Sequence, residues 1–578
     1  MSRWAPTDGR HVAVVEKSGR FRAVEFMFER GPRVALVRGS VDAGPGRMVL
    51  ADFGRGGAKA VRDLGSAKRA SDVAAALLWE AGLERGFRPE LEAEAREAAA
   101  GARDATGARR DLTALDTFTV DPATARDFDD AVSAQAEGDG VRLWIHIADV
   151  AAHVRPGSGL EREAYQRGTS VYVPGTVEPM LPQALSDDAC SLAPGVERLA
   201  VTTELVVSAS GEPSAASFYR SVTRSDARLD YEQLDRIFAG RESAPDAVAD
   251  PLAAARRAAA ALAEHRPVAS LEIESFEPEF SFDSEGSVTG AHGVEQTEAH
   301  KLIEHLMIVT NEQVAQLTER RKIPGLYRVH ERPEPARVAQ LIEQLAALDI
   351  PTPALPDNLA PAEAGELIAE ASRLVAREAA RRGHGRAAYT SLVLRSLKQA
   401  SYSHRNIGHA GLGSPAYAHF TSPIRRYPDL VVHRGLLSAV GEGEDEPDSA
   451  HVSEAGWRSS EREREAVSIE RRADRACAAF LLERELFEHG WGTTFEGEVS
   501  GLVGGGAFVA FKGELADVYE GFLPARRMRR DRYDLNETET SIVGRHNGAV
   551  ISLGDPVTVT VSGIEAPRGR VDLEPAGG

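Results

Sequence analysis

Arg142-Leu143-Trp144-Ile145-His146-Ile147 is the stretch that decides the fold class of the largest region of the chain. Its period-two alternation places Leu143, Ile145 and Ile147 on one face, which predicts a half-buried β-strand. A second strand is expected within residues 199–207, and helical spacing follows at residues 298–317, at residues 364–382 and after Ile424. Because strands and helices are mixed, we expect an α+β core over residues 111–440, which is large for one domain.

Shorter regions flank this core and make the chain multidomain. Residues 1–70 alternate apolar runs with glycine-rich turns, which predicts a small β-barrel of the cold-shock or OB type. Residues 71–110 have helical spacing and are expected to form a helical connector. Residues 441–490 begin with an acidic segment, expected to be a solvated loop, and continue as a charged helix. Residues 491–575 return to short strands with glycine turns, which predicts an OB-type barrel for single-stranded nucleic acid.

Composition indicates the cellular compartment of the protein and the partners that it can bind. None of the 578 residues belongs to an apolar run of the roughly 18 residues needed to cross a bilayer, so we expect no membrane association. The first residues lack the features of a secretory signal, and the only cysteines, Cys190 and Cys477, are too few for a disulfide framework or a zinc site. These features predict a cytoplasmic protein. The net charge of −20 argues against nonspecific coating of nucleic acid but is compatible with a local basic channel.

Four carboxylates lie close together at Asp121, Asp127, Asp129 and Asp130, and only Arg126 offsets their charge. Like charges at short range raise one another's pKa unless a cation compensates them, and a bound divalent ion would relieve the repulsion. Ligation by carboxylate oxygens favours magnesium, with manganese as a second choice, over zinc, and such ions support phosphodiester cleavage. An acidic surface turn is the alternative, and in so acidic a protein it is the commoner one. A calcium-binding EF-hand loop is disfavoured because its required glycine and final glutamate are missing.

Longer motifs then follow one another along the chain. The most extensive is Tyr417-Ala418-His419-Phe420-Thr421-Ser422-Pro423-Ile424-Arg425-Arg426-Tyr427-Pro428-Asp429-Leu430. With the other motifs in chain order, the set comprises residues 119–131, 146–150, 169–174, 180–182, 185–186, 190–192, 300–304, 326–331 and 417–430.

In this order the motifs resemble those of the ribonuclease II/R family of processive 3′-to-5′ exoribonucleases, and the resemblance covers most of the chain. It implies that residues 111–440 form the catalytic RNB domain of that family. It also implies that Asp121, Asp127 and Asp130 are metal-site residues, and that Asp129 is both a metal-site and a catalytic residue. Arg425 matches an arginine that contacts the phosphate near the scissile bond, so it is expected to bind RNA and to stabilise the transition state.

Further residues are implied to bind RNA. Tyr172 matches an aromatic residue that stacks on the 3′-terminal bases, Glu304 matches a residue beside the terminal nucleotide, and Arg426 is expected to contact RNA next to Arg425. Some relatives complete the base clamp with a phenylalanine at the position aligned to Ile273, so stacking is expected to be weaker here. Residues 1–70 supply one barrel where family members often have two.

The C-terminal barrel resembles the S1 class of OB folds through residues 495–500, 507–509 and 553–555. Its arginines form the densest basic patch of the chain and are expected to follow an RNA backbone, although a solvated charge run is equally compatible with them. The residues expected to bind RNA are Arg526, Arg527, Arg529 and Arg530, with Arg532 and Tyr533 alongside.

These expectations combine into one function. We expect a magnesium-dependent, processive 3′-to-5′ exoribonuclease that hydrolyses single-stranded RNA with a free 3′ end to nucleoside 5′-monophosphates, acting as a monomer. The glycine-rich residues 501–506 lack the Lys-Ser/Thr of a phosphate-binding loop, so no nucleoside triphosphate is expected. The alternative is a catalytically inactive RNA-binding regulator that retains the RNB fold.

Overall fold

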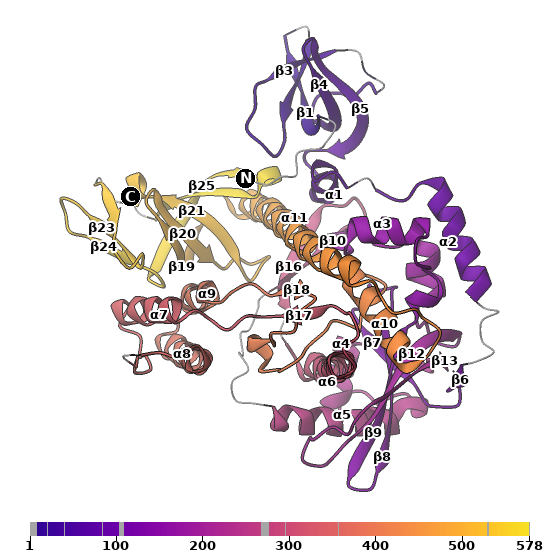
Figure 1. Ribbon diagram of the computed structural model, residues 1–578. Coiled ribbons are helices and arrows are strands. Elements are labelled where there is room, and N and C mark those ends of the chain that lie inside the picture. Colours follow the sequence, from indigo (N-terminus) through magenta and orange to yellow (C-terminus); the bar gives the residue numbers. More distant parts are fainter. Residues whose placement is uncertain are drawn as a thin grey trace.

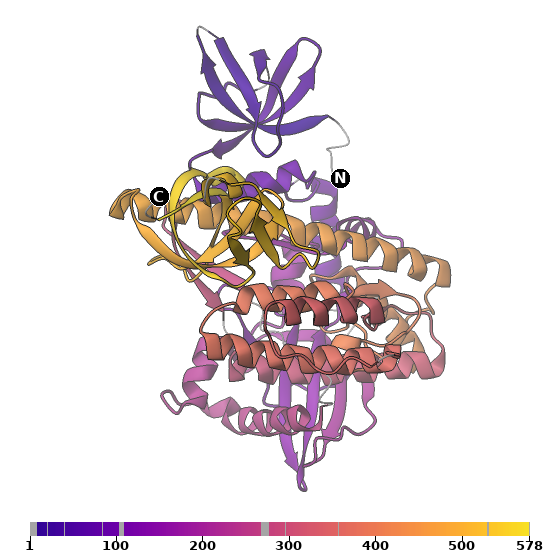
Figure 2. The ribbon, with the colours of Figure 1, turned by 90° about the vertical axis from the view of Figure 1, so that its left-hand side faces the viewer.

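The computed structural model describes residues 9–576 apart from 20, 38, 40, 84, 103–108, 267–276, 295, 357, 529 and 530. Two small barrels and one large mixed core make up the molecule, and the long helix α11 (Ser449–His489) runs from the core to the C-terminal barrel (Figure 1). Figure 2 shows the N-terminal barrel standing above the core, with the C-terminal barrel beneath it in that view. The predicted multidomain α+β fold with flanking OB-type barrels is confirmed.

The N-terminal barrel is closed by five strands in the order β1-β2-β3-β5-β4. Small and β-branched residues such as Ala13, Val15, Val24 and Val49 fill its interior, as expected for a barrel too narrow for large side chains. Its strands are β1 (Arg10–Ser18), β2 (Phe21–Phe26), β3 (Val34–Val37), β4 (Arg47–Gly54) and β5 (Gly57–Ser66).

The region after the barrel contains two helices, α1 (Ala70–Glu80) and α2 (Pro89–Ala102). Helix α1 is not a free tether, because it buries Leu77 and Leu78 in a core that it shares with α11 and the C-terminal barrel. The N-terminal barrel is therefore attached to the core through a packed helix.

The central sheet has seven strands in the order β14-β7-β8-β9-β12-β13-β6. Strand β9 contains the residues that led to the prediction of this sheet, and Leu143, Ile145 and Ile147 are fully buried. Neighbouring strands are antiparallel except at the two edges, where β14 lies parallel to β7 and β6 parallel to β13. The strands are β6 (Arg110–Asp111), β7 (Phe118–Asp121), β8 (Asp130–Glu137), β9 (Gly140–Ala148), β12 (Glu197–Val207), β13 (Ser217–Arg224) and β14 (Ala227–Asp230).

Helices α5, α6 and α10 bury their apolar residues in the same core as the sheet, and α5 packs directly on β8 and β9. The helices of this region are α3 (Gly159–Arg167), α4 (Tyr231–Phe238), α5 (Ala249–His265), α6 (Glu298–Arg321) and α10 (Tyr427–Val440). Short helical turns occur at η2 (Val150–Ala152), η3 (Ala184–Ala189), η4 (Asp246–Val248), η5 (Ala410–Leu412) and η6 (Ala566–Arg568). Paired short strands are β10 (Val171–Val173) with β11 (Thr176–Glu178), β15 (Glu277–Phe282) with β16 (Val288–Val294), and β17 (Tyr327–Val329) with β18 (Ser401–Ser403).

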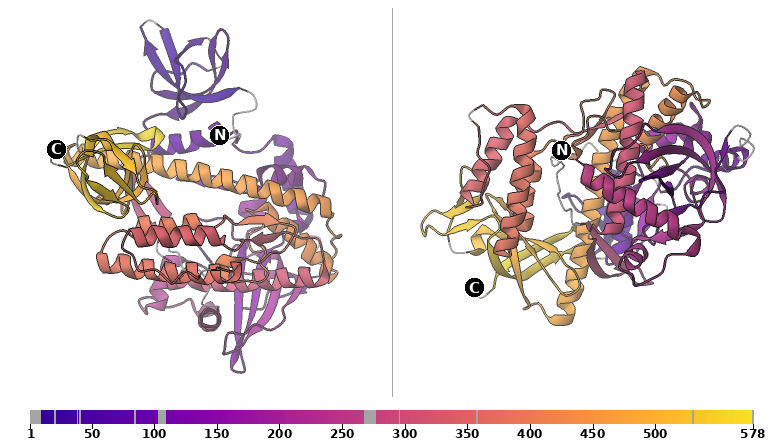
Figure 3. Two further views of the ribbon diagram at one scale, coloured as in Figure 1. Left: turned by 60° about the vertical axis from the view of Figure 1, so that its left-hand side comes forward. Right: turned by 90° about the horizontal axis from the view of Figure 1, so that it is seen from below.

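Three helices of the central region do not join the core of the sheet. Helices α7 (Pro335–Ala347), α8 (Pro361–Arg382) and α9 (Arg386–Ser396) form a separate apolar cluster, which includes Val499, Ala507 and Leu553 of the C-terminal region. Figure 3 shows these helices beside the C-terminal barrel. The expected single core over residues 111–440 is thus divided into two packing units.

Helix α11 has 41 residues, which corresponds to a length of about 60 Å at 1.5 Å per residue. It begins at Ser449, where the Asp448 carboxylate accepts a hydrogen bond from the N–H of His451 (3.1 Å). None of the helices within the described residues is long and apolar enough to span a bilayer. The C-terminal barrel that follows is closed by β19 (Thr494–Val503), β20 (Gly506–Phe511), β21 (Tyr519–Pro524), β25 (Pro556–Glu565) and β26 (Arg570–Pro575), with α12 (Ala525–Met528) and a small sheet of β22 (Tyr533–Leu535), β23 (Ser541–Gly544) and β24 (Val550–Ser552) inserted.

Candidate active site

The four aspartates lie where two strands of the central sheet meet a loop. Asp121 ends β7 and Asp130 begins β8, so residues 122–129 form a loop at this edge. The N–H of Ala148 donates to the carbonyl of Asp129 (2.9 Å), which ties the end of the loop to β9. The aspartates are therefore held by the sheet and are not a flexible surface turn.

Burial and mutual repulsion raise the pKa of three of these carboxyls. Burial raises the pKa of Asp129 well above its ordinary value, although the guanidinium of Arg425 opposes this. Burial, followed by repulsion from Asp130, raises the pKa of Asp121 to about 8, and burial raises that of Asp130 to about 6. The site therefore lacks the positive charge needed to keep these three carboxyls ionised at their ordinary pKa.

This arrangement fits a hard divalent cation. The Oδ2 atoms of Asp121 and Asp129 are buried and have no hydrogen-bond partner among the described residues. Within that same part of the chain, no three of the four aspartates bring carboxylate oxygens within 4.8 Å of one another, so they do not form a closed cage. Magnesium is usually held by one or two carboxylates together with water and substrate phosphates, which suits such an open group.

The loop before α10 brings Arg425 to the aspartates. Its Nε atom lies 3.5 Å from Asp129 Oδ2, and its Nη2 donates to Ser422 Oγ (3.1 Å). The backbone N–H of Ile424 donates to the other carboxylate oxygen of Asp129 (2.8 Å). The Arg425 side chain remains 43% exposed, so its guanidinium can still contact a phosphate placed beside the carboxylates.

Arg426 is oriented differently from Arg425. Its Nη2 donates to Asp429 Oδ1 (2.7 Å), and this carboxylate also accepts from the N–H of Ser422 (2.8 Å). The side chain is 19% exposed and its counterion fully buried. This geometry argues for a structural role and against the expected contact of Arg426 with RNA.

Tyr172, in β10, contacts the aspartate loop. Its hydroxyl donates to Asp127 Oδ2 (3.1 Å), while its backbone N–H donates to Glu470 of α11 (2.9 Å). The residue is 39% exposed, which is high for so large an aromatic side chain. Its ring is therefore available for stacking right beside the carboxylates, as the family resemblance implies.

Glu304 is exposed on α6, and the same helix carries a contact that sequence reasoning missed. The ring of Tyr231 stacks on that of His300, with centroids 4.0 Å apart and an angle of 9° between the planes. Burial, followed by the charges of Asp130 and Asp121, raises the pKa of the Tyr231 hydroxyl. Tyr231 is thus close to the aspartates, and only the pairing of β14 with β7 brings it there.

The basic patch of the C-terminal barrel is partly neutralised. The Arg527 guanidinium contacts Ser562 and lies 3.6 Å from a Glu574 carboxylate oxygen, whereas Arg526 is exposed beside a cavity of about 580 Å³ that Phe522 also lines. The rings of Phe508 and Phe522 are neighbours, with centroids 5.3 Å apart. Arg529, Arg530 and Ile273 lie outside the described residues.

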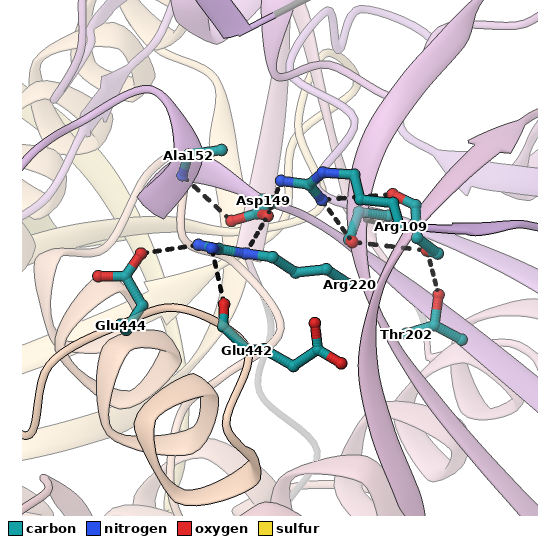
Figure 4. A network of polar contacts seen from close by, with 9 residues as sticks. Arg109, Asp149, Ala152, Thr202, Arg220, Glu442 and Glu444 are labelled. Carbon is teal, nitrogen blue, oxygen red and sulfur yellow. Dashed lines mark hydrogen bonds and ion pairs between the residues drawn. The ribbon is translucent and has the colours of Figure 1, made fainter. Parts of the chain in front are cut away.

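Another buried aspartate close to the site has a different environment (Figure 4). Asp149 Oδ2 lies 2.6 Å from Arg109 Nη2 and 2.9 Å from Arg220 Nε. Arg220 also donates to the carbonyl of Glu442 (2.9 Å) and to the Glu444 carboxylate (2.7 Å). Residues 441–448 thus form a largely exposed loop, as predicted, but the part-buried Arg220 anchors it to the core at Glu442 and Glu444.

Comparison with known proteins agrees with this geometry. The family model of the RNB domain matches residues 109–442, and that of the S1 RNA binding domain matches residues 488–574. The chain therefore belongs to the ribonuclease II/R (RNB) family, and the resemblance stated from its motifs is confirmed.

Individual relatives extend the comparison. The chain is 36% identical to ribonuclease R of Aquifex aeolicus over 81% of the chain and 64% of that protein. It is 34% identical to ribonuclease R of Thermotoga maritima over 85% of the chain and 68% of the relative. It thus spans only about two thirds of the length of these relatives. The apo form of Mycoplasma genitalium RNase R shares the fold, with a TM-score of 0.87, 23% identity, and coverage of 98% of this chain and 90% of that one.

Proposed function

We propose that the protein is a magnesium-dependent, processive 3′-to-5′ exoribonuclease that hydrolyses single-stranded RNA to nucleoside 5′-monophosphates. The observation that carries this proposal is the convergence of uncompensated buried aspartates, the exposed Arg425 guanidinium and the exposed Tyr172 ring at one place. The ribonuclease R relatives support an RNA substrate, and the free 3′ end is part of our proposal.

Each residue then has a distinct task. Asp121, Asp127, Asp129 and Asp130 would hold magnesium, which when bound supplies the Lewis-acid chemistry of phosphodiester hydrolysis. The N–H of Ile424 holds one oxygen of the Asp129 carboxylate, so the second oxygen, which accepts no hydrogen bond among the described residues, would be able to hold the cation. The Arg425 guanidinium is placed to stabilise charge on the phosphate as the bond breaks.

Substrate binding can be assigned to the aromatic and basic surfaces. Tyr172 would stack on the 3′-terminal base, worth about 1–3 kcal/mol, and hold the last phosphodiester beside the aspartates. Basic residues outnumber acidic ones two to one in residues 1–70, although the whole chain has a net charge of −20. This local excess of positive charge favours RNA near the N-terminal barrel.

The remaining expectations are retained as proposals. The two buried thiols, Cys190 and Cys477, suit a reducing compartment, so we place the activity in the cytoplasm. A single chain carries every residue of the proposed site, so we infer that a monomer is active.

The proposal is tested with the purified chain, magnesium and single-stranded RNA labelled at its 3′ end. We expect labelled mononucleotide to appear from the first turnovers, whereas circular RNA of the same sequence stays intact. Asp129→Asn should lower kcat at least about 1000-fold, because it removes a charge that is required in the transition state. Asp139→Asn, in the exposed turn between β8 and β9, is the matched control and should keep full activity.

Three outcomes would contradict the proposal. Cleavage of circular RNA would show an endonuclease, and full activity of Asp129→Asn would remove the aspartates from the chemistry. RNA binding without any metal-dependent turnover would favour the inactive regulator.

A further inference from the structure

Ser191 is a fully buried serine to which the proposed mechanism gives no role. It follows the π-helical turn η3 (Ala184–Ala189), in which the N–H of Cys190 donates to the carbonyl of Leu185 five residues earlier (2.9 Å). Turns of this kind are rare and occur often at functional sites. Here the turn directs the serine hydroxyl toward the aspartate loop.

The hydroxyl binds the loop on both sides of Asp127. Ser191 Oγ donates to the carbonyl of Arg126 (2.7 Å) and accepts from the N–H of Phe128 (3.1 Å). The N–H of Leu192 then donates to the carbonyl of Phe128 (3.0 Å). Three hydrogen bonds thus fix the backbone that carries Asp127, although the two segments are more than 60 residues apart in the sequence.

Ser191 is itself held from the central sheet. Arg198, in β12, donates from Nε to the carbonyl of Ser191 (2.9 Å) and from Nη2 to Asp188 Oδ1 (2.9 Å). The N–H of Ser191 donates to the carbonyl of Asp188 (3.1 Å). The contacts therefore run without interruption from β12 through Arg198 and Ser191 to the loop.

We propose that Ser191 is a positioning residue that sets the Asp127 carboxylate toward the divalent cation and toward the Tyr172 hydroxyl. The proposal rests on the proposed function for its catalytic consequence, but the metal-binding part stands on its own. Asp127 is the aspartate that accepts from Tyr172, so one hydroxyl would orient both a metal ligand and the stacking residue. Without it, a buried N–H of Phe128 loses its acceptor and the loop must rearrange.

The experiment measures Mn²⁺ binding to the full chain by electron paramagnetic resonance in the absence of RNA, followed by kcat and KM with magnesium. We expect Ser191→Ala to weaken Mn²⁺ binding by about 10- to 100-fold, as is usual when a group that orients a metal ligand is lost, and to lower kcat more than it raises KM. The matched control is Ser221→Ala, because Ser221 is equally buried and hydrogen-bonded but contacts Thr202 and not the loop. It should lose comparable thermal stability and keep Mn²⁺ affinity within about twofold.

A second variant keeps the test decisive if Ser191→Ala does not fold. Arg198→Gln retains the hydroxyl but frees the segment that presents it, and should weaken Mn²⁺ binding by about three- to tenfold. Unchanged Mn²⁺ affinity in the Ser191 or Arg198 variant, or an equal loss in Ser221→Ala, would overturn the positioning role. Wild-type protein that binds Mn²⁺ without cleaving RNA would refute only the proposed function.

Discussion

Asp129 and Asp149 are both almost completely buried, with 3% and 1% exposure, yet the protein treats their charges in opposite ways. Burial raises the pKa of Asp129 well above its ordinary value, because the single partly exposed Arg425 does not compensate it. Burial also acts on Asp149, but the guanidiniums of Arg220 and Arg109 outweigh it and lower the pKa. Burial alone therefore does not distinguish a structural aspartate from a functional one.

The number of positively charged groups around each carboxylate distinguishes the structural aspartate from the functional one. Asp149 has its positive charges built in from Arg109 and Arg220, so it stabilises the fold without any ligand. Asp129 Oδ2 has no hydrogen-bond partner among the described residues, and Arg425, 3.5 Å away, offsets its charge only in part, so full neutralisation depends on a proton or a cation from outside. A buried carboxylate whose charge the fold does not balance lowers the free energy of unfolding unless a proton or a bound cation neutralises it.

The largest expected effect concerns the compensated aspartate. Asp149→Asn should lower the free energy of unfolding by about 3–5 kcal/mol, because it removes the carboxylate that Arg109 and Arg220 share and leaves Arg220 with Glu444 as its only acidic partner among the described residues. Urea unfolding followed by tryptophan fluorescence measures this, with Asp139→Asn as the exposed control. A loss below about 1 kcal/mol would show that the arginines find other partners and would break the contrast with Asp129.

The next effect is a pH-dependent stabilisation by magnesium. Between the ordinary value of 3.8 and the raised values of about 6 for Asp130 and about 8 for Asp121, the folded protein binds more protons than the unfolded chain. This contribution to the stability of the metal-free protein is therefore present at low pH and is lost as pH rises through this window. Magnesium at about 100 times its Kd should restore about 2.7 kcal/mol above pH 8 and very little near pH 5.

Thermal unfolding with magnesium or with EDTA at several pH values checks this prediction. An equal magnesium effect at all pH values would mean that the cation binds away from the aspartates.

A smaller effect, on kcat, is expected when the hydrogen bond between Tyr172 and Asp127 is removed. Tyr172→Phe keeps the ring but removes the hydrogen bond to Asp127, which should lower kcat by about two- to tenfold, equivalent to about 0.5–1.5 kcal/mol. KM should change little, because stacking is retained. Steady-state kinetics on single-stranded RNA separates the two, and a KM effect without a kcat effect would place the hydroxyl on the RNA and not on Asp127.

The smallest effect is expected for the stability of Asp129→Asn, which can be compared directly with that of Asp149→Asn. At pH values below the raised pKa of the Asp129 carboxyl, Asp129→Asn should change the free energy of unfolding by less than about 1 kcal/mol, because the amide oxygen can still accept from the Ile424 N–H. As pH rises, the metal-free variant should become the more stable protein. Urea unfolding in EDTA tests this, and a loss like that expected for Asp149→Asn would show that both aspartates are structural.

The sequence predicted those helices, strands and clusters whose defining residues lie close together along the chain. The alternation around Ile145 predicted β9, the helical spacing from Glu298 predicted α6, and the crowding of aspartates predicted the repulsion that, after burial, raises the pKa of Asp121. Each signal lies within a few residues, so no knowledge of the fold was needed to read it.

Contacts between distant segments could not be predicted in this way. The acidic segment around Glu444 has the composition of a solvated loop, which does not reveal that Arg220, 224 residues away, anchors it to the core. Tyr231 had no motif of its own, and the position of Ser191 depends on where a π-helical turn meets the aspartate loop. Helices α7–α9 have ordinary amphipathic spacing, which does not specify that they pack on the C-terminal barrel.

The packing of α1 has a consequence for the order in which the chain matures during synthesis. Its apolar residues Leu77 and Leu78 share a core with α11 and with β26 of the C-terminal barrel. At about 5–20 residues per second, β26 leaves the ribosome about 25–100 s after α1, since about 500 residues separate them. Until then Leu77 and Leu78 lack part of the core that covers them, so the nascent chain should need a chaperone until β26 is made.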